Sequence, residues 1–198
     1  MSPRRALCWL ALFTLWYLAP GLPGSAAQAE LPLIRRLCGP LAGLAASAQW
    51  VRTDLALEAG REDLAWTRAE LALALDPTAT DGWYYLARHL ALDRSAADRC
   101  PDAAQRAHWF RLGLSVLERG EAHAGRPAEL ILDRGLLLAY LGSLPEGEIP
   151  WPGGAAGAWG QARQAFQRAA ELGHPQAADL AQRAGDIMAE LGAGAPPD

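Results

Sequence analysis

The chain of 198 residues contains no lysine and no asparagine, and only 2 valines, 4 isoleucines and 5 threonines. β-Branched residues fill the pleated surface of strands, so their scarcity argues against a sheet protein. Alanine and leucine, which favour helices, number 42 and 33. Because 14 prolines and 20 glycines would interrupt any single long helix, the composition predicts an all-α fold built from several short helices.

The absence of lysine leaves arginine as the only strongly basic residue type. The 18 arginines are outnumbered by 22 acidic residues, which gives a net charge of −4. A nucleic-acid-binding protein of the usual basic kind is therefore not expected. Hydrophobic residues make up 51% of the chain, enough to build a core, and the length is that of one domain.

The first 29 residues have the layout of an export signal. Arg4 and Arg5 precede an uncharged apolar run over residues 6–19, and Ala27 and Ala29 supply the small residues of a signal-peptidase site. The alternative is an uncleaved membrane tether through residues 6–22. Both alternatives place the bulk of the chain outside the cytoplasm, either in the periplasm or anchored in the cytoplasmic membrane of a bacterium. Residues 193–198 are expected to form a disordered tail.

Apolar spacing and helix-ending residues predict seven helices in the remainder. Leu41, Leu44, Ala48, Val51 and Leu55 recur every three or four residues and form one apolar face of the first helix. The expected helices cover residues 41–60, 61–75, 80–92, 101–120, 127–142, 158–173 and 175–192, with a long Pro/Gly-rich loop at 143–157. Short connections predict antiparallel neighbours, and hence three helical hairpins at 41–75, 80–120 and 126–172, followed by a terminal helix.

Two short motifs stand out along these helices, each in a helix of its own. Trp83, Leu86 and Ala87 lie in one helix, and Ala162, Phe166 and Ala169 lie in another, ahead of Pro175. A related segment at 65–77 has the small residues and the closing proline, but has Ala69 where an aromatic residue is usual. This pattern resembles the tetratricopeptide repeat, whose first helix carries W-x2-L-G-x2-Y and whose second carries A-x3-F-x2-A before a proline.

The resemblance implies a solenoid of about three helical hairpins over residues 30–192 with a capping helix at its C-terminal end. In that family the first helix of each hairpin lines a concave groove that binds a partner protein. The residues that the resemblance places on this groove are Trp50, Asp54, Asp81, Tyr84 and Arg88. The residues expected to point into the hairpins are Trp83, Leu86, Ala87 and Leu90, with Trp66, Trp109, Phe110 and Phe166 filling the hairpin cores. Trp151, in the long loop, is a further candidate for partner binding.

The sequence carries no signature of an enzyme. It has no phosphate-binding loop, no HExxH and no nucleophile elbow. The four histidines, His89, His108, His123 and His174, are expected to be isolated, so we expect no metal site and no cofactor. Cys38 and Cys100 could form one disulfide after export, or could be two small buried hydrophobic residues.

These observations together predict a protein–protein interaction scaffold or assembly factor on the extracytoplasmic side of the membrane. One alternative is a structural subunit of a membrane complex, tethered by an uncleaved N-terminal helix. A second alternative is an accessory subunit of an enzyme. The sequence does not identify the protein partner.

Overall fold

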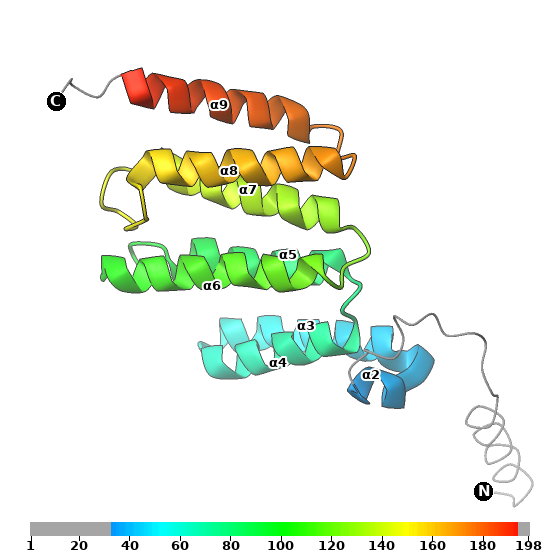
Figure 1. Ribbon diagram of the computed structural model, residues 1–198. Helices are drawn as coiled ribbons and strands as arrows, with labels where there is room; N and C mark the ends of the chain where they lie inside the picture. The colour runs from blue at the N-terminus through cyan, green and yellow to red at the C-terminus, as the bar shows by residue number, and fades with distance from the viewer. Residues whose placement is uncertain (1–32, 194–198) are drawn as a thin grey trace, which may run out of the picture.

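The computed structural model describes residues 33–193, and within that range the ordered elements are all helices, with no strand (Figure 1). They are α2 (Leu33–Cys38), the short 3-10 helix η2 (Gly39–Leu41), α3 (Ala42–Glu58), α4 (Glu62–Leu75), α5 (Thr80–Arg88), the π-helix η3 (His89–Arg94), α6 (Ala103–Glu121), α7 (Pro127–Ser143), α8 (Gly154–Glu171) and α9 (Ala177–Ala193). The prediction of an all-α protein is therefore confirmed for this part of the chain.

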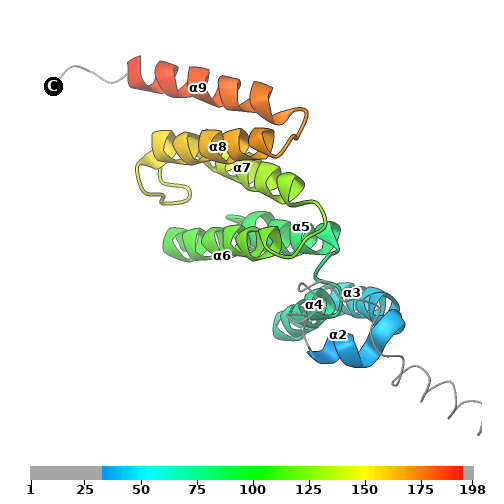
Figure 2. The same cartoon turned by 45° about the vertical axis from the view of Figure 1, so that its right-hand side comes forward.

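The helices pack as consecutive pairs. In the first pair α3 lies along α4, in the second pair α5 and η3 lie along α6, and in the third pair α7 lies along α8, with α9 packed against α8. Figure 1 shows the pairs stacked in sequence order, and α5 and α7 lie on the same side of α6 and α8. Figure 2 shows the first pair more nearly end-on than the other two, so it is turned relative to them.

Local sequence explains where several helices begin and end. The carboxylate of Asp102 accepts a hydrogen bond from the backbone N–H of Ala104 at 3.1 Å and caps α6. Pro127 occupies the first turn of α7, where no backbone donor is needed. Gly60 and Gly173 follow α3 and α8 with φ of 67° and 86°, a left-handed conformation that glycine adopts without strain.

The core is continuous through the second and third pairs. Trp83, Leu86, Ala87 and Leu90 are buried as predicted, and Phe110 and Phe166 are among the largest fully buried side chains. The indole N–H of Trp83 donates to the carbonyl of Pro77 at 2.8 Å, so burial of this ring leaves no polar atom unpaired. By contrast, Trp66 and Trp109, which were expected to fill hairpin cores, are only half-buried.

The apolar face predicted for the first helix is exposed. Leu44 and Val51 keep 72% and 60% of their surface accessible, and Leu41 and Leu55 are similarly open. The buried face of α3 carries smaller side chains instead, namely Ala42, Ala46, Thr53 and Ala56. Small side chains allow α3 and α4 to pack closely, and this contact decides which face of α3 is buried.

Three details differ from the predicted boundaries. Residues 33–41 form α2 and η2, which were not predicted, and α8 begins at Gly154 inside the predicted loop. The helix after Arg88 continues as a π-helix. The predicted export segment lies outside the described residues, as does the predicted tail apart from Ala193, which still belongs to α9. None of the helices within residues 33–193 has both the length and the apolar character needed to span a bilayer.

One buried arginine connects two loops. Arg106, which is 8% exposed, donates to the carbonyl of Glu148 through Nε at 2.9 Å and Nη2 at 2.6 Å. Its Nη1 donates to the carbonyls of Cys100 and Pro101 at 2.8 and 2.7 Å. The guanidinium thus joins the α5–α6 connection to the α7–α8 connection through backbone oxygens.

Candidate partner-binding groove

A groove of about 380 Å³ lies between α5–η3 and α7. Its lining residues are Tyr84, Arg88 and Leu92 on one side and Asp133, Leu136, Leu137 and Tyr140 on the other. On each side these residues recur every three or four positions, which places them on one face of their helix. The packing of α5 against α7 brings the two faces together.

Tyr84 and Arg88 form one wall of the groove. They are four residues apart on α5, and Arg88 donates a hydrogen bond from Nη1 to the hydroxyl of Tyr84. The guanidinium carbon lies 5.1 Å from the centre of the Tyr84 ring, within cation–π range. Arg88 is exposed and Tyr84 is half-buried, while Leu86 and Leu90 of the same helical segment are buried.

The opposite wall contains a carboxyl group with a perturbed pKa. Burial raises the pKa of Asp133 to about 6, Arg88 acts against that rise, and Glu129 adds to it. The groove can therefore change its charge near pH 6.

The rim of this wall is apolar. Leu136 and Tyr140 leave 43% and 45% of their surface exposed, although both side chains are large and hydrophobic. The groove therefore combines two tyrosines, exposed aliphatic surface, one arginine and one acidic group. Such a surface can hold an amphipathic polypeptide segment through apolar contact and a small number of polar bonds.

Trp50 and Asp54, predicted for the same strip, connect α3 to α5 instead. Trp50 meets the ring of Tyr85 edge-on, with 5.5 Å between ring centres. Asp54 accepts a hydrogen bond from the Tyr85 hydroxyl at 2.6 Å. Burial is the main cause that raises the pKa of Tyr85 to about 12, and the bond to Asp54 adds to the effect. These residues therefore join the first pair to the second and do not line the groove between α5 and α7.

The other predicted binding residues also have partners within the chain. Asp81 faces Arg126 with 3.3 Å between the charged atoms, and its side chain remains almost fully exposed. Trp151 packs edge-on against Phe110 of α6 at 6.0 Å between ring centres, and the guanidinium of Arg111 lies 5.8 Å from its ring. Of the six predicted residues, the structure places only Tyr84 and Arg88 in the groove.

The two cysteines of the described range are free thiols. Cys38 lies in α2 and is half-buried. Cys100 is buried before α6, with its sulfur 3.6 Å from the carbonyl oxygen of Asp102 and 3.5 Å from the side-chain oxygen of Gln105. The disulfide that the sequence left open is not formed in this structure.

Sequence reasoning missed two groups of residues. Asp133, Leu136 and Tyr140 have a helical spacing that could have been recognised, but the sequence does not show that α7 lies beside α5. His89 was expected to be isolated, yet its Nδ1 lies 3.1 Å from Asp93 Oδ2. Their separation of four residues was the available signal.

No family model, no curated protein and no solved structure matches this chain.

Proposed function

We propose that this protein is a scaffold or assembly factor of the tetratricopeptide type, which binds a segment of a partner protein in the groove between α5 and α7. Support for the repeat comes from the order of packing, because α5 and α6 both contact α7, and α8 in turn contacts α9. Each pair thus stacks on the next, as the repeat requires. The Trp83 and Phe166 motifs lie in buried positions, which fits their proposed role as repeat anchors.

The observation that carries the proposal is the composition of the groove. Tyrosine and arginine are enriched among the residues that dominate binding energy at protein interfaces. Here Tyr84 and Arg88 are held against each other on one wall, opposite Tyr140 and Leu136 on the other. A partner segment with apolar side chains and one or two polar groups is the ligand that such a surface favours.

The proposal includes a location outside the cytoplasm. It rests on Arg4 and Arg5 ahead of the apolar run at residues 6–19. A reporter enzyme that is active only after export, fused after Asp198, is expected to be active. Activity of a reporter that works only in the cytoplasm would contradict export, and sequencing of the mature N-terminus would separate a cleaved signal from an uncleaved tether.

The groove is tested by combining crosslinking with substitution. A photo-crosslinking residue in place of Tyr140 should trap the partner, which mass spectrometry then identifies. With that partner purified, the double change Tyr84→Ala and Arg88→Ala should weaken binding by about 2 kcal/mol or more, the size of an interface hot spot. The folded state should be retained, because Arg88 is exposed and Tyr84 is only partly buried against the core, and circular dichroism of the double variant checks this.

The matched control is Gln164→Ala, an exposed position on α8. Binding that is equally strong in the double variant and in the control would contradict the groove as the binding site.

A further inference from the structure

A second cavity, of about 540 Å³, lies between the first and second helix pairs, away from the groove. Leu57 of α3, Trp66 of α4, Leu86 and Leu90 of α5 and η3, and Trp109 and Leu112 of α6 provide most of its apolar wall. Its volume is within the range of about 300–1,000 Å³ that is usual for small-molecule sites. Trp66 and Trp109, both half-buried, line this cavity.

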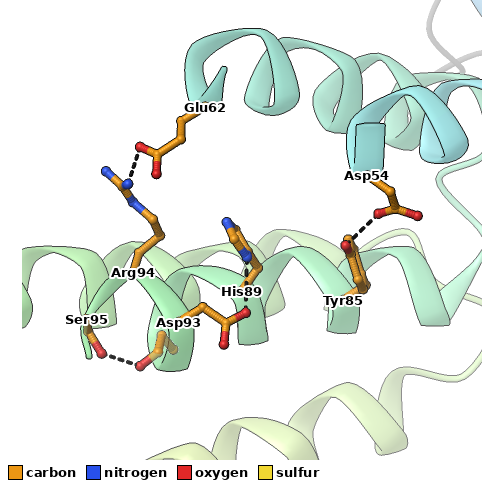
Figure 3. A network of polar contacts seen from close by, with 8 residues as sticks. Asp54, Glu62, Tyr85, His89, Asp93, Arg94 and Ser95 are labelled. Carbon is orange, nitrogen blue, oxygen red and sulfur yellow. Dashed lines mark hydrogen bonds and ion pairs between the residues drawn. The ribbon is translucent and has the colours of Figure 1, made fainter. Parts of the chain in front are cut away.

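Two polar bridges join the helix pairs at the borders of the cavity (Figure 3). The hydroxyl of Tyr85 donates to Asp54 at 2.6 Å. Arg94 forms an ion pair with Glu62, and its guanidinium lies 4.7 Å from the centre of the Trp109 ring. Both bridges tie the first helix pair to the second beside the cavity, and they engage the carboxylates of Asp54 and Glu62.

His89 presents a free ring nitrogen to this cavity. Its Nδ1 lies 3.1 Å from Asp93 Oδ2, and Figure 3 shows the ring pointing from η3 toward the first helix pair. In the tautomer whose Nδ1–H donates to Asp93, the other ring nitrogen, Nε2, is a hydrogen-bond acceptor. The segment that holds both residues is a π-helix, a local departure that is frequent at functional sites.

The charges around the cavity favour a cation. Glu62 and Asp63 line it, and Asp54 and Asp93 are bonded to the lining residues Tyr85 and His89. The field of Asp54 and Asp93 reaches the wall, since both help to raise the pKa of Tyr85. Arg94 is the only arginine of the lining, and Glu62 already pairs with it. The other titratable lining residue, His108, is exposed and meets Trp109 edge-on.

We propose that this cavity binds a small aromatic amine. The ligand's ring packs against Trp66 and Trp109, and its ammonium group donates a hydrogen bond to His89 Nε2. The carboxylates around the site attract the same positive charge. A carboxylate-bearing ligand of the same shape is disfavoured, because it offers no donor to His89 and meets an excess of negative charge.

Calorimetric titration of the full chain with tryptamine and with indole-3-propionate tests the proposal, because the two probes share a ring and carry opposite charges. Tryptamine should bind at least about tenfold more tightly, the factor that one charge-assisted hydrogen bond provides. Equal affinity for the two probes, preference for the acid, or no binding of tryptamine would overturn the proposal.

Substitutions locate the bound amine. His89→Phe, which keeps a ring but removes the acceptor, should weaken tryptamine binding about tenfold or more, whereas His174→Phe at the α8–α9 turn should not. Asp93→Ala should also weaken binding and should leave the fold intact, because the Asp93 side chain is 59% exposed. Asp98→Ala, at an exposed position in the connection between η3 and α6, is its control. Unchanged affinity in both the His89 and the Asp93 variants would overturn the proposal.

NMR signals of leucine methyl groups distinguish binding in this cavity from binding in the groove. Addition of tryptamine should shift the methyl signals of Leu57 and Leu90 and leave those of Leu136 and Leu137 unchanged. Shifts confined to Leu136 and Leu137 would place the amine in the groove between α5 and α7 and would contradict the proposed site. Because the two sites share no lining residue, either proposal can fail without the other.

Discussion

The ring of Phe166 occupies the space in which a side chain on Gly135 would begin. A Cβ atom on Gly135 would lie 2.5 Å from Phe166 Cε1 and 2.6 Å from Cδ1. Phe166 is 1% exposed, so its ring has little room to move aside. The close contact of α7 with α8 therefore requires glycine at one helix position and a large aromatic ring at the facing one.

Gly135→Ala is expected to destabilise the protein by about 1–3 kcal/mol, as overpacking of a filled core does. The measurement is the free energy of unfolding from denaturant titration. Gly43→Ala is the matched control, because a Cβ at that position in α3 meets nothing within 4 Å. The control should raise stability by about 0.5 kcal/mol through helix propensity alone. If Gly135→Ala proved as harmless as Gly43→Ala, the proposed α7–α8 contact would be wrong.

Arg106→Met is expected to lower the free energy of unfolding by about 3 kcal/mol. It leaves the carbonyls of Cys100, Pro101 and Glu148 without their donor, and each unpaired buried acceptor costs about 1–3 kcal/mol. Arg106→Lys should not restore stability, since a single ammonium group cannot replace the fork of the guanidinium. Arg99→Met, at an exposed position, should change stability by less than about 0.5 kcal/mol. A small effect at Arg106 would show that the two loops do not depend on it.

The carboxyl group of Asp133 should make stability depend on pH between about 4 and about 6. Its pKa of about 6 in the folded protein exceeds the ordinary value of about 3.9 for the unfolded chain. The folded state therefore binds more protons in this window, and its stability falls as the pH rises through it. Asp133→Asn should remove that part of the pH dependence, and Asp98→Asn should not. Parallel stability–pH curves for the parent and Asp133→Asn would contradict the raised pKa.

Tyr85 should produce a second pH effect in alkaline solution. Its pKa of about 12 when folded exceeds the ordinary value of about 10, so the stability it contributes is complete below pH 10 and is lost as the pH rises toward 12. The chain has no lysine, so the only side chains with an ordinary pKa near this window are its 4 tyrosines. Tyr85→Phe should reduce the loss, as followed by tyrosinate absorbance and circular dichroism. An identical alkaline transition in Tyr140→Phe and Tyr85→Phe would exclude a special role for Tyr85.

Composition and helix-ending residues were sufficient to predict the helices of the described range beyond Leu41. The signals are local: the prolines and glycines that limit a helix act within a turn or two of it. Local signals fail at Leu44 and Val51, where a regular apolar stripe is exposed because α4 packs against the alanine face of the same helix. Periodicity identifies an apolar face, but it does not show whether a neighbour covers that face.

Only one wall of the candidate groove could be predicted, because spacing along one helix does not show which other helix becomes its neighbour. Tyr84 and Arg88 share a face by their spacing alone, whereas Asp133 and Tyr140 join them only because α7 packs beside α5. The π-helix at η3 was not predicted, because the buried residues at its start, Leu90 and Ala91, still follow Leu86 and Ala87 at the four-residue spacing of an α-helix. The association of His89 with Asp93 was missed together with it.

The cavity between the first two helix pairs has a consequence for folding cooperativity. In a stacked helical protein, stability is shared among units through their interfaces, and the unit with the weakest interface opens first. The first pair meets the second through α4 on α5, through the ring of Trp50 on that of Tyr85, and through three polar bridges, Asp54–Tyr85, Glu62–Arg94 and Glu70–Arg119. The cavity occupies part of the space where apolar packing would otherwise lie. Residues 42–75 therefore form the unit whose backbone amides should exchange with solvent earliest, while the second and third pairs remain folded around Phe110 and Phe166.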